Sequence, residues 1–173
     1  MTTKIRIKPF LAAYFRQKYW DEEAKATKFP TSSLIRVKIL FSLRKRPADV
    51  PVDSGNLELV VPTSQDFPEK KDTMAWNYIP PSKVSGGPTR PGIERIMENE
   101  FYSDLNDYWY RYKYYGLTFK DAVEDFVDIY DLPVDPDTIR KFHTRWQDRS
   151  RQFKKTRKYE QQRQLLKKMA ENG

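Results

Sequence analysis

The chain has 173 residues, of which 38% are hydrophobic, 32% charged and 14% aromatic, and its formal net charge is +8. The absence of cysteine excludes disulfides, thiolate metal sites and a cysteine nucleophile, and the aromatic content argues against disorder throughout. This length suits one domain with or without an appendage. No stretch approaches the roughly 20 apolar residues of a membrane span, and the N-terminal residues lack a secretory pattern. We therefore expect a soluble protein of the cytoplasm.

The excess positive charge lies entirely in the last part of the chain. Residues 137–173 hold 12 Lys and Arg against 4 Asp and Glu, whereas residues 1–136 hold 20 of each kind. A device for solubility would spread charge over the surface, while a polyanion-binding surface concentrates it. This asymmetry predicts a polyanion, and nucleic acid first, as the partner.

The N-terminal part predicts one short strand and two helices. Residues 4–8 alternate basic and apolar side chains, which indicates an edge strand, and Pro9 can start a helix. Residues 21–27 are polar and predict a turn. Residues 31–33 are N-cap residues for a segment to residue 46 whose apolar spacing fits both a helix and a strand. The cap and the basic end of that segment favour a helix.

Residues 47–91 form a proline-rich connector in the prediction. They hold eight of the 12 prolines, which prevents long regular elements. Only residues 56–61 have the pattern of a strand. Three apolar or aromatic side chains are expected to attach this connector to the core: Trp76, Tyr78 and Ile79.

From residue 93 onward the pattern becomes helical. Apolar residues recur at helical spacing from Ile93 to Tyr112, and Gly116 can end this helix in a left-handed conformation. Thr118 and Asp121 form a capping signal for a second helix to Tyr130, whose outer face is acidic.

A last long helix is predicted after Asp135, which can cap it, and Pro136, which suits its first turn. One side of this helix carries an apolar stripe of Ile139, Phe142, Trp146 and Phe153. From residue 154 the pattern weakens, so the end of the chain is expected to fray.

These patterns predict a mainly α protein with a small β component. The expected architecture is a helical bundle with a variant helix-turn-helix and a basic C-terminal helical arm. We divide the chain into an N-terminal helical and β part with its connector (1–91), a helical domain (92–153) and a basic, partly frayed extension (154–173).

The side of the last helix opposite the stripe is basic and predicts a DNA-reading surface. A helix fits the major groove, where Arg can pair with guanine and Lys or Thr can meet phosphates. We expect four residues to face the groove: Arg140, Lys141, Thr144 and Arg145. Six more are expected to contact phosphates: Arg149, Arg151, Lys154, Lys155, Arg157 and Lys158. The connector 131–136 is longer than a usual helix-turn-helix turn and lacks glycine, so the motif would be a variant. A surface helix that only provides solubility is the alternative.

Residues 108–115 interleave aromatic and basic side chains, a pattern that can bind single-stranded nucleic acid by stacking. Helical spacing predicts that some of the rings belong to the core: Tyr108, Trp109 and Tyr112. The more exposed residues are expected to be Tyr110, Arg111, Lys113 and Tyr114. Core packing alone explains most of this pattern.

No pattern indicates a reaction. The acidic groups Asp104 with Asp107, and Glu124 with Asp125 and Asp128, lack a third ligand of fixed type. The only histidine, His143, falls beside the apolar stripe and is expected to be a packing or partly buried residue. Phosphate-binding loops, nucleophile elbows and zinc-protease motifs are absent from the sequence. We therefore expect no enzyme, no metal and no cofactor.

The succession IRIKPFLAAYF, LRKRPADVP, WNYIP and GLTFKDAVEDFVDIYDLPVDPDTIRKFHTRW resembles a group of small proteins from Bacteroidetes and their phages or mobile elements. The resemblance spans most of the chain and implies a mobile-element setting but no particular reaction. Its most helix-turn-helix-like part contains Phe142, Trp146, Arg149 and Arg151.

The predicted function is therefore duplex DNA binding without catalysis, as a regulator or an accessory of replication or recombination. The main alternative is a phage structural or assembly protein located in the virion. Its basic arm would contact an acidic protein surface or packaged DNA, and such a protein would form a homo-oligomer. A further alternative is binding of single-stranded DNA or RNA through the tyrosine-rich helix.

Overall fold

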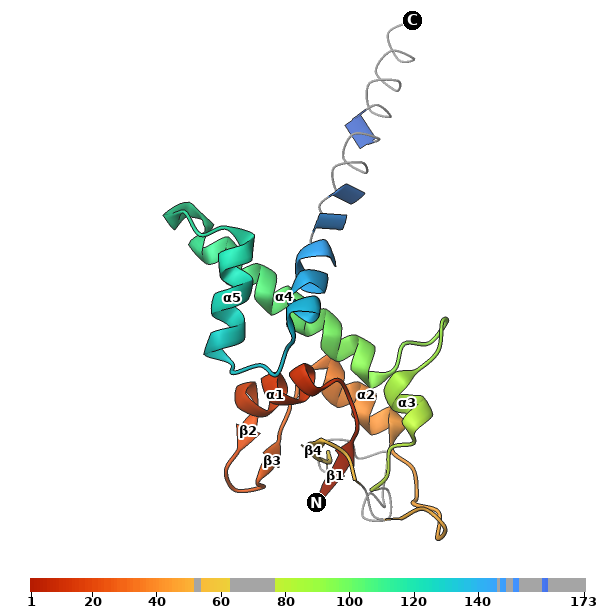
Figure 1. The fold of residues 1–173 in the computed structure, drawn as a ribbon. Helices are drawn as coiled ribbons and strands as arrows, with labels where there is room; N and C mark the ends of the chain where they lie inside the picture. The colour runs from red at the N-terminus through yellow and green to blue at the C-terminus, as the bar shows by residue number, and fades with distance from the viewer. Residues whose placement is uncertain (52–53, 63–76, 146, 149–150, 153–159, 162–173) are drawn as a thin grey trace, which may run out of the picture.

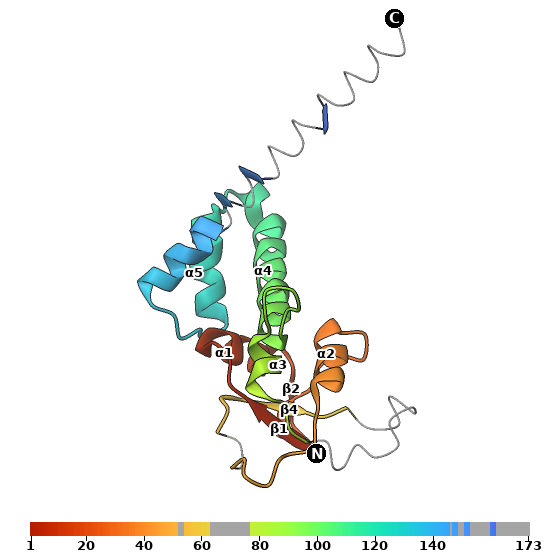
Figure 2. The ribbon, with the colours of Figure 1, turned by 90° about the vertical axis from the view of Figure 1, so that its right-hand side faces the viewer.

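Helices make up most of the molecule, and a small four-stranded sheet closes one end of it (Figure 1). The computed structural model describes residues 1–51, 54–62, 77–145, 147–148, 151–152 and 160–161. A mainly α architecture with a small β component is thus confirmed for these residues. The last helix (136–145) and its predecessor in the chain lie at the end of the molecule away from the sheet (Figures 1 and 2).

The sheet has the strand order β1-β4-β3-β2 and mixes antiparallel with parallel pairing. Its strands are β1 (Thr2–Ile5), β2 (Trp20–Asp21), β3 (Ala26–Thr27) and β4 (Leu57–Val60). β4 is central because it pairs antiparallel with β1 and parallel with β3. Leu57 and Leu59 are fully buried on one face of β4, as the alternation of a half-buried strand requires.

β1 is an edge strand, as predicted, but it ends three residues before the predicted limit of residue 8. The physical reason is Asn56, whose side-chain amide replaces the ladder at Ile7. Its oxygen accepts from the Ile7 amide at 3.0 Å, and its nitrogen donates to the Ile7 carbonyl at 2.8 Å. Gly55 permits this close approach, because a Cβ there would lie 2.4 Å from the Ile5 carbonyl oxygen.

The prediction of a simple turn at residues 21–27 was incomplete. The chain forms a hairpin there, in which β2 and β3 pair antiparallel. Lys25 has a φ of 51° in the connecting turn. Strands of two residues are too short to produce an alternating pattern, so the sequence carries no signal for them.

The helices begin close to their predicted starts, except for a five-residue helix at residues 81–85, which the sequence pattern does not predict within the connector. They are α1 (Pro9–Lys18), α2 (Leu34–Ser42), α3 (Pro81–Ser85), α4 (Ile93–Tyr112) and α5 (Phe119–Ile129), followed by the last helix at residues 136–145, which we call the C-terminal helix. A single 3₁₀ turn, η2 (Lys113–Tyr115), continues α4. The predicted α2 cap is confirmed, since the Ser33 hydroxyl accepts from the Ile35 amide at 3.1 Å.

α2 ends earlier than predicted, at Ser42 instead of residue 46. Arg44 pairs through its backbone with Tyr78, by hydrogen bonds of 2.8 and 3.2 Å. This bridge ties the connector to the body and removes the basic residues from the helix. Ile79 beside it is buried, as predicted, whereas Trp76 lies outside the described residues.

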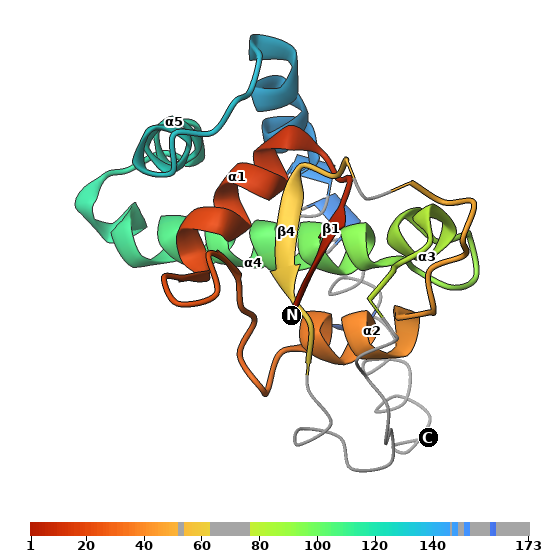
Figure 3. The same ribbon diagram turned by 90° about the horizontal axis from the view of Figure 1, so that it is seen from below.

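α4 is the spine of the molecule. Its buried side chains recur at four-residue spacing, at Ile93, Met97, Phe101 and Leu105. β1 and β4 cross over it, with α1 and α2 on either side (Figure 3). One hydrophobic cluster therefore extends from Ile5 to Phe142, across the boundary expected near residue 92.

A polar network fixes α1 to α4. The Tyr14 hydroxyl donates to Asp104 at 2.6 Å, and the Lys18 ammonium donates to Asp104 and to Glu100 at 2.6 and 3.0 Å. Burial and the Asp104 carboxylate raise the pKa of Tyr14 above its usual range. Burial alone would lower the pKa of Lys18, but the hydrogen bonds to Asp104 and Glu100 raise it overall. Asp104 thus has a structural role, because it accepts hydrogen bonds from two side chains of α1.

The turn between α4 and α5 follows its predicted chemistry. Gly116 has a φ of 88°, the left-handed conformation expected at the end of the helix. Thr118 then caps α5: its hydroxyl accepts from the Asp121 amide at 3.2 Å, and the Asp121 carboxylate accepts from the Thr118 amide at 3.0 Å. This reciprocal capping box confirms the predicted start of α5.

Candidate nucleic-acid interface

The C-terminal helix starts where its sequence signals place it. Asp131 turns the chain with a φ of 43°, and the buried Leu132 side chain then fixes the connector. The Asp135 carboxylate accepts from the Thr138 amide at 2.6 Å, as a cap should. Hydrogen bonds from Thr138 hold the pKa of Asp135 below its usual value, so the cap is charged at neutral pH.

Phe142 anchors this helix in the core. Its side chain is 2% exposed. Its ring centroid lies 5.2 Å from that of Phe10 in α1, and 5.4 and 5.7 Å from those of Phe101 and Tyr102 in α4. Of the predicted apolar stripe, Ile139 is half-buried beside Phe142, and Trp146 and Phe153 lie outside the described residues.

Arg145 forms a second anchor, on the same side as Phe142. Its guanidinium carbon lies 3.9 Å from the Tyr102 ring centroid, and its Nη1 lies 3.8 Å from a Glu98 carboxylate oxygen. Glu98 is buried and also pairs with Lys8, at the start of α1. Burial raises the pKa of Tyr102 despite the neighbouring guanidinium. A buried carboxylate needs such partners, so this cluster joins three segments of the chain.

The position of Arg145 therefore differs from the outward position that the helical phase predicts. The physical reason is Glu98, whose buried charge attracts a cation from each neighbouring segment. No sequence pattern predicts this pairing, because Lys8, Glu98 and Arg145 are far apart along the chain.

The other three residues predicted to face the groove are exposed. Arg140 pairs with Asp137 one turn earlier, and the Thr144 hydroxyl donates to the Arg140 carbonyl oxygen at 3.0 Å. Lys141 is exposed as well, on the side of the helix that carries Arg145. Ion pairs between exposed side chains are weak, so Arg140 remains available to another anion.

The six predicted phosphate contacts are only partly described. Arg151 is helical and exposed. The other five lie outside the described residues: Arg149, Lys154, Lys155, Arg157 and Lys158.

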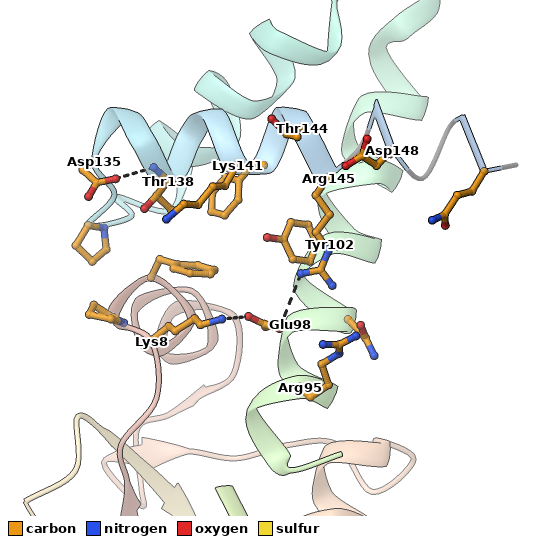
Figure 4. A pocket seen from close by; sticks show the side chains of 16 residues that line it. Lys8, Arg95, Glu98, Tyr102, Asp135, Thr138, Lys141, Thr144, Arg145 and Asp148 are labelled. Atoms are coloured by element: carbon orange, nitrogen blue, oxygen red, sulfur yellow. Dashed lines mark hydrogen bonds and ion pairs between the residues drawn. The ribbon is translucent and has the colours of Figure 1, made fainter. Parts of the chain in front are cut away.

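A groove of about 990 Å³ lies between the start of α1, the first half of α4 and the C-terminal helix (Figure 4). Lys8, Glu98 and Arg145 meet in it, and Lys141 lines it from the C-terminal helix. Within the described part of the chain, neither Lys141 nor Arg95 of α4 forms an ion pair. The groove can thus offer cations to an anionic ligand from two helices.

The tyrosine-rich segment differs from its prediction at two positions. Tyr108 and Trp109 are half-buried, as their phase predicts, and Tyr110, Arg111 and Tyr114 are exposed. Tyr112, however, is 44% exposed instead of belonging to the core. α5 leaves the end of α4 uncovered there, because η2 and Gly116 carry the chain outward before it returns. Lys113 is half-buried among rings instead of exposed.

His143 is half-buried against the Phe119 ring, with ring centroids 6.2 Å apart, as expected of a packing residue. Its Nε2 atom has no hydrogen-bond partner in the described structure. Among the described residues, no group of three or more His, Cys, Asp or Glu side chains is arranged to hold a metal ion. No helix in the described ranges is both long and apolar enough to cross a membrane.

Comparisons with protein-family models, curated proteins and solved structures found no match. The function is therefore inferred from the charges and geometry of this chain alone.

Proposed function

We propose that this protein binds nucleic acid, duplex DNA in particular, through its C-terminal helix and the basic residues that follow, without catalysis. The observation that carries the proposal is the confinement of the whole net charge of +8 to residues 137–173. The remaining 136 residues are electrically balanced, and they contribute every described residue of the hydrophobic core cluster except Phe142.

The anchoring of the helix supports this proposal. Phe142 and Arg145 hold the C-terminal helix against α1 and α4, while Arg140, Lys141 and Thr144 remain exposed, the last two at the groove beside these helices. A helix held in this way can enter a major groove in one orientation. Arg140 could then pair with a guanine edge, while Lys141 and Thr144 bind phosphates.

The proposal includes a variant helix-turn-helix in which α5 supports the C-terminal helix. A capped α5 precedes it across a connector that is longer than a usual helix-turn-helix turn, and Phe119 of α5 contacts His143 of the C-terminal helix. In this arrangement Arg145 is a positioning residue instead of a base contact. The biological setting we propose is regulation, or assistance to replication or recombination, in a phage or mobile element.

A salt titration of duplex binding tests the proposal. Each phosphate that the protein neutralises should add about −0.9 to the slope of log K against log salt. We expect a steep decline for the full chain. The double variant Arg140→Gln and Lys141→Gln should bind more weakly with a shallower slope, by roughly 1–2 units, because each lost contact removes a counterion.

The matched control replaces two exposed lysines distant from the helix, Lys25 and Lys83, with Gln, which removes the same charge. A flat salt response, absence of binding at low salt, or an equal loss in the control would refute the proposal. A stable high-order oligomer that binds DNA without sequence preference would instead favour a phage structural or assembly protein.

A further inference from the structure

The free end of α4 carries an aromatic surface that the proposed DNA-binding helix does not use. We call residues 108–116 the aromatic tip. Four of its tyrosines are exposed: Tyr110 (53%), Tyr112 (44%), Tyr114 (84%) and Tyr115 (86%). The tip projects from the end of the molecule away from the sheet (Figure 1). Large rings gathered at one exposed place indicate a binding surface.

The base of the aromatic tip is fixed, so its outer rings are held on a rigid support. The Trp109 indole nitrogen donates to the Leu117 carbonyl oxygen at 3.2 Å, and its ring meets Phe119 at 5.8 Å. The 3₁₀ turn η2 and the left-handed Gly116 then reverse the chain into α5. Tyr114 and Tyr115 stand at this reversal, which explains their exposure.

Cations are interleaved with these rings. The Lys113 ammonium lies 4.1 Å from the Tyr110 ring centroid, 5.0 Å from that of Tyr114 and 5.6 Å from that of Trp109. Contacts of this kind hold a Lys side chain in place through the negative face of the ring. Arg111 is exposed beside them, and residues 108–116 contain no acid.

We propose that the aromatic tip binds single-stranded nucleic acid by stacking unpaired bases on Tyr114 and Tyr115. Every charged residue of the tip is a cation, so its partner is anionic. Its most exposed side chains are flat rings, so its partner presents flat faces. Single strands offer both in every nucleotide, whereas a duplex keeps its bases stacked inside. Lys113 and Arg111 would contact the phosphates. This inference is independent of the proposed function, because it concerns another surface and another form of nucleic acid.

The test compares ring loss with ring retention in the full chain. Fluorescence anisotropy would measure the affinity for labelled oligothymidylate and oligouridylate of about 12 nucleotides, within the usual site size. Replacing Tyr114 and Tyr115 with Ala should weaken binding about 5- to 150-fold for each ring that stacks a base. The matched variant with Phe at both positions keeps the rings and should keep the wild-type affinity. Both side chains are exposed, so neither variant should disturb the core.

Duplex binding under the same conditions separates this inference from the proposed function. The Ala pair should leave duplex affinity and its salt slope unchanged, since the tip contributes no contact there. A loss of affinity for both oligothymidylate and oligouridylate supports a site for stacked bases and phosphates. A loss of affinity for only one of them supports the same site with a preference for deoxyribose or ribose. An Ala pair equal to wild type, or a Phe pair as weak as the Ala pair, would overturn the inference. So would an Ala pair that changes only the oligomeric state in sedimentation, which would identify a protein interface.

Discussion

Replacing Phe142 with Ala should detach the C-terminal helix from the body. The ring is 2% exposed and contacts aromatic rings from two helices, with centroids 5.2 Å from Phe10 and 5.4 Å from Phe101. Burial of a phenyl side chain stabilises a fold by about 1.5–3 kcal/mol, and each aromatic pair adds about 0.5–1.5 kcal/mol. Truncation of such a residue costs about 3–5 kcal/mol in free energy of unfolding.

We expect a value in that range because the site cannot collapse freely. Arg145, one turn later, is held by Glu98 and Tyr102, so the helix cannot easily shift into the cavity. Urea denaturation of the full chain would give the loss in unfolding free energy. Hydrogen exchange would show whether the amides of residues 137–145 lose more protection than those of α4, as local opening requires.

Thr144→Ala is the control, because this exposed residue lies on the same helix and should change the free energy of unfolding by about 0.5 kcal/mol or less. A loss below about 1 kcal/mol for Phe142→Ala, or one equal to the control, would refute the anchoring argument. Duplex binding supplies a second readout. Phe142→Ala should weaken affinity while the salt slope stays unchanged, since no charge is removed.

Three further predictions concern the body of the protein. Gly92→Ala should destabilise the fold by about 1–3 kcal/mol, because its Cβ would lie 2.2 Å from a backbone oxygen of α3. The control is Gly87→Ala, whose Cβ would meet no atom within 4 Å, so it should leave thermal stability nearly unchanged. Equal losses of stability for the two variants would contradict this prediction. Thr118→Ala removes the α5 cap and should cost about 0.5–2 kcal/mol in urea denaturation, with full stability the contrary result. The pKa values of Tyr14 and Lys18 are raised above 10.0 and 10.5, so the stability that these two groups contribute should be complete below pH 10 and fall as pH rises above it. Tyr14→Phe should flatten this fall, and an unchanged pH dependence of the unfolding free energy would show that Tyr14 is not its source.

Local chemistry is what the sequence predicts well in this protein. The Ser33 and Thr118 caps, the left-handed Gly116 and the start at Asp135 depend on neighbouring residues, so each is readable from a short segment. The limits of elements are less accessible when a distant partner sets them. The side chain of Asn56 ends β1 by pairing with Ile7. The backbone of Tyr78 pairs with Arg44, so α2 ends before Arg44.

In the candidate interface, too, the sequence predicts features that depend on one helix and misses those that depend on a neighbouring helix. Helical phase predicts correctly that Arg140 and Thr144 are exposed and that Phe142 is buried. Helical phase also predicts that Arg145 points outward, because the phase depends only on the sequence of that one helix and not on the helices packed against it. The buried charge of Glu98 decides the direction of Arg145, and that residue lies on another helix. Exposure of Tyr112 likewise depends on where α5 packs, which no pattern within residues 108–115 encodes.

The contact of α1 with the C-terminal helix has a consequence for the order of folding. Phe142 contacts Phe10, and Arg145 pairs with Glu98, which also pairs with Lys8, so the C-terminal helix completes clusters whose other members are synthesised before it. Contacts so distant in sequence form late, because the intervening chain must first be ordered. A nascent chain that stops before residue 136 is electrically balanced and lacks the contact between the Phe10 and Phe142 rings. Residues 137–173 thus bring both the excess positive charge and the contacts that orient it, and we expect both to be acquired late in folding.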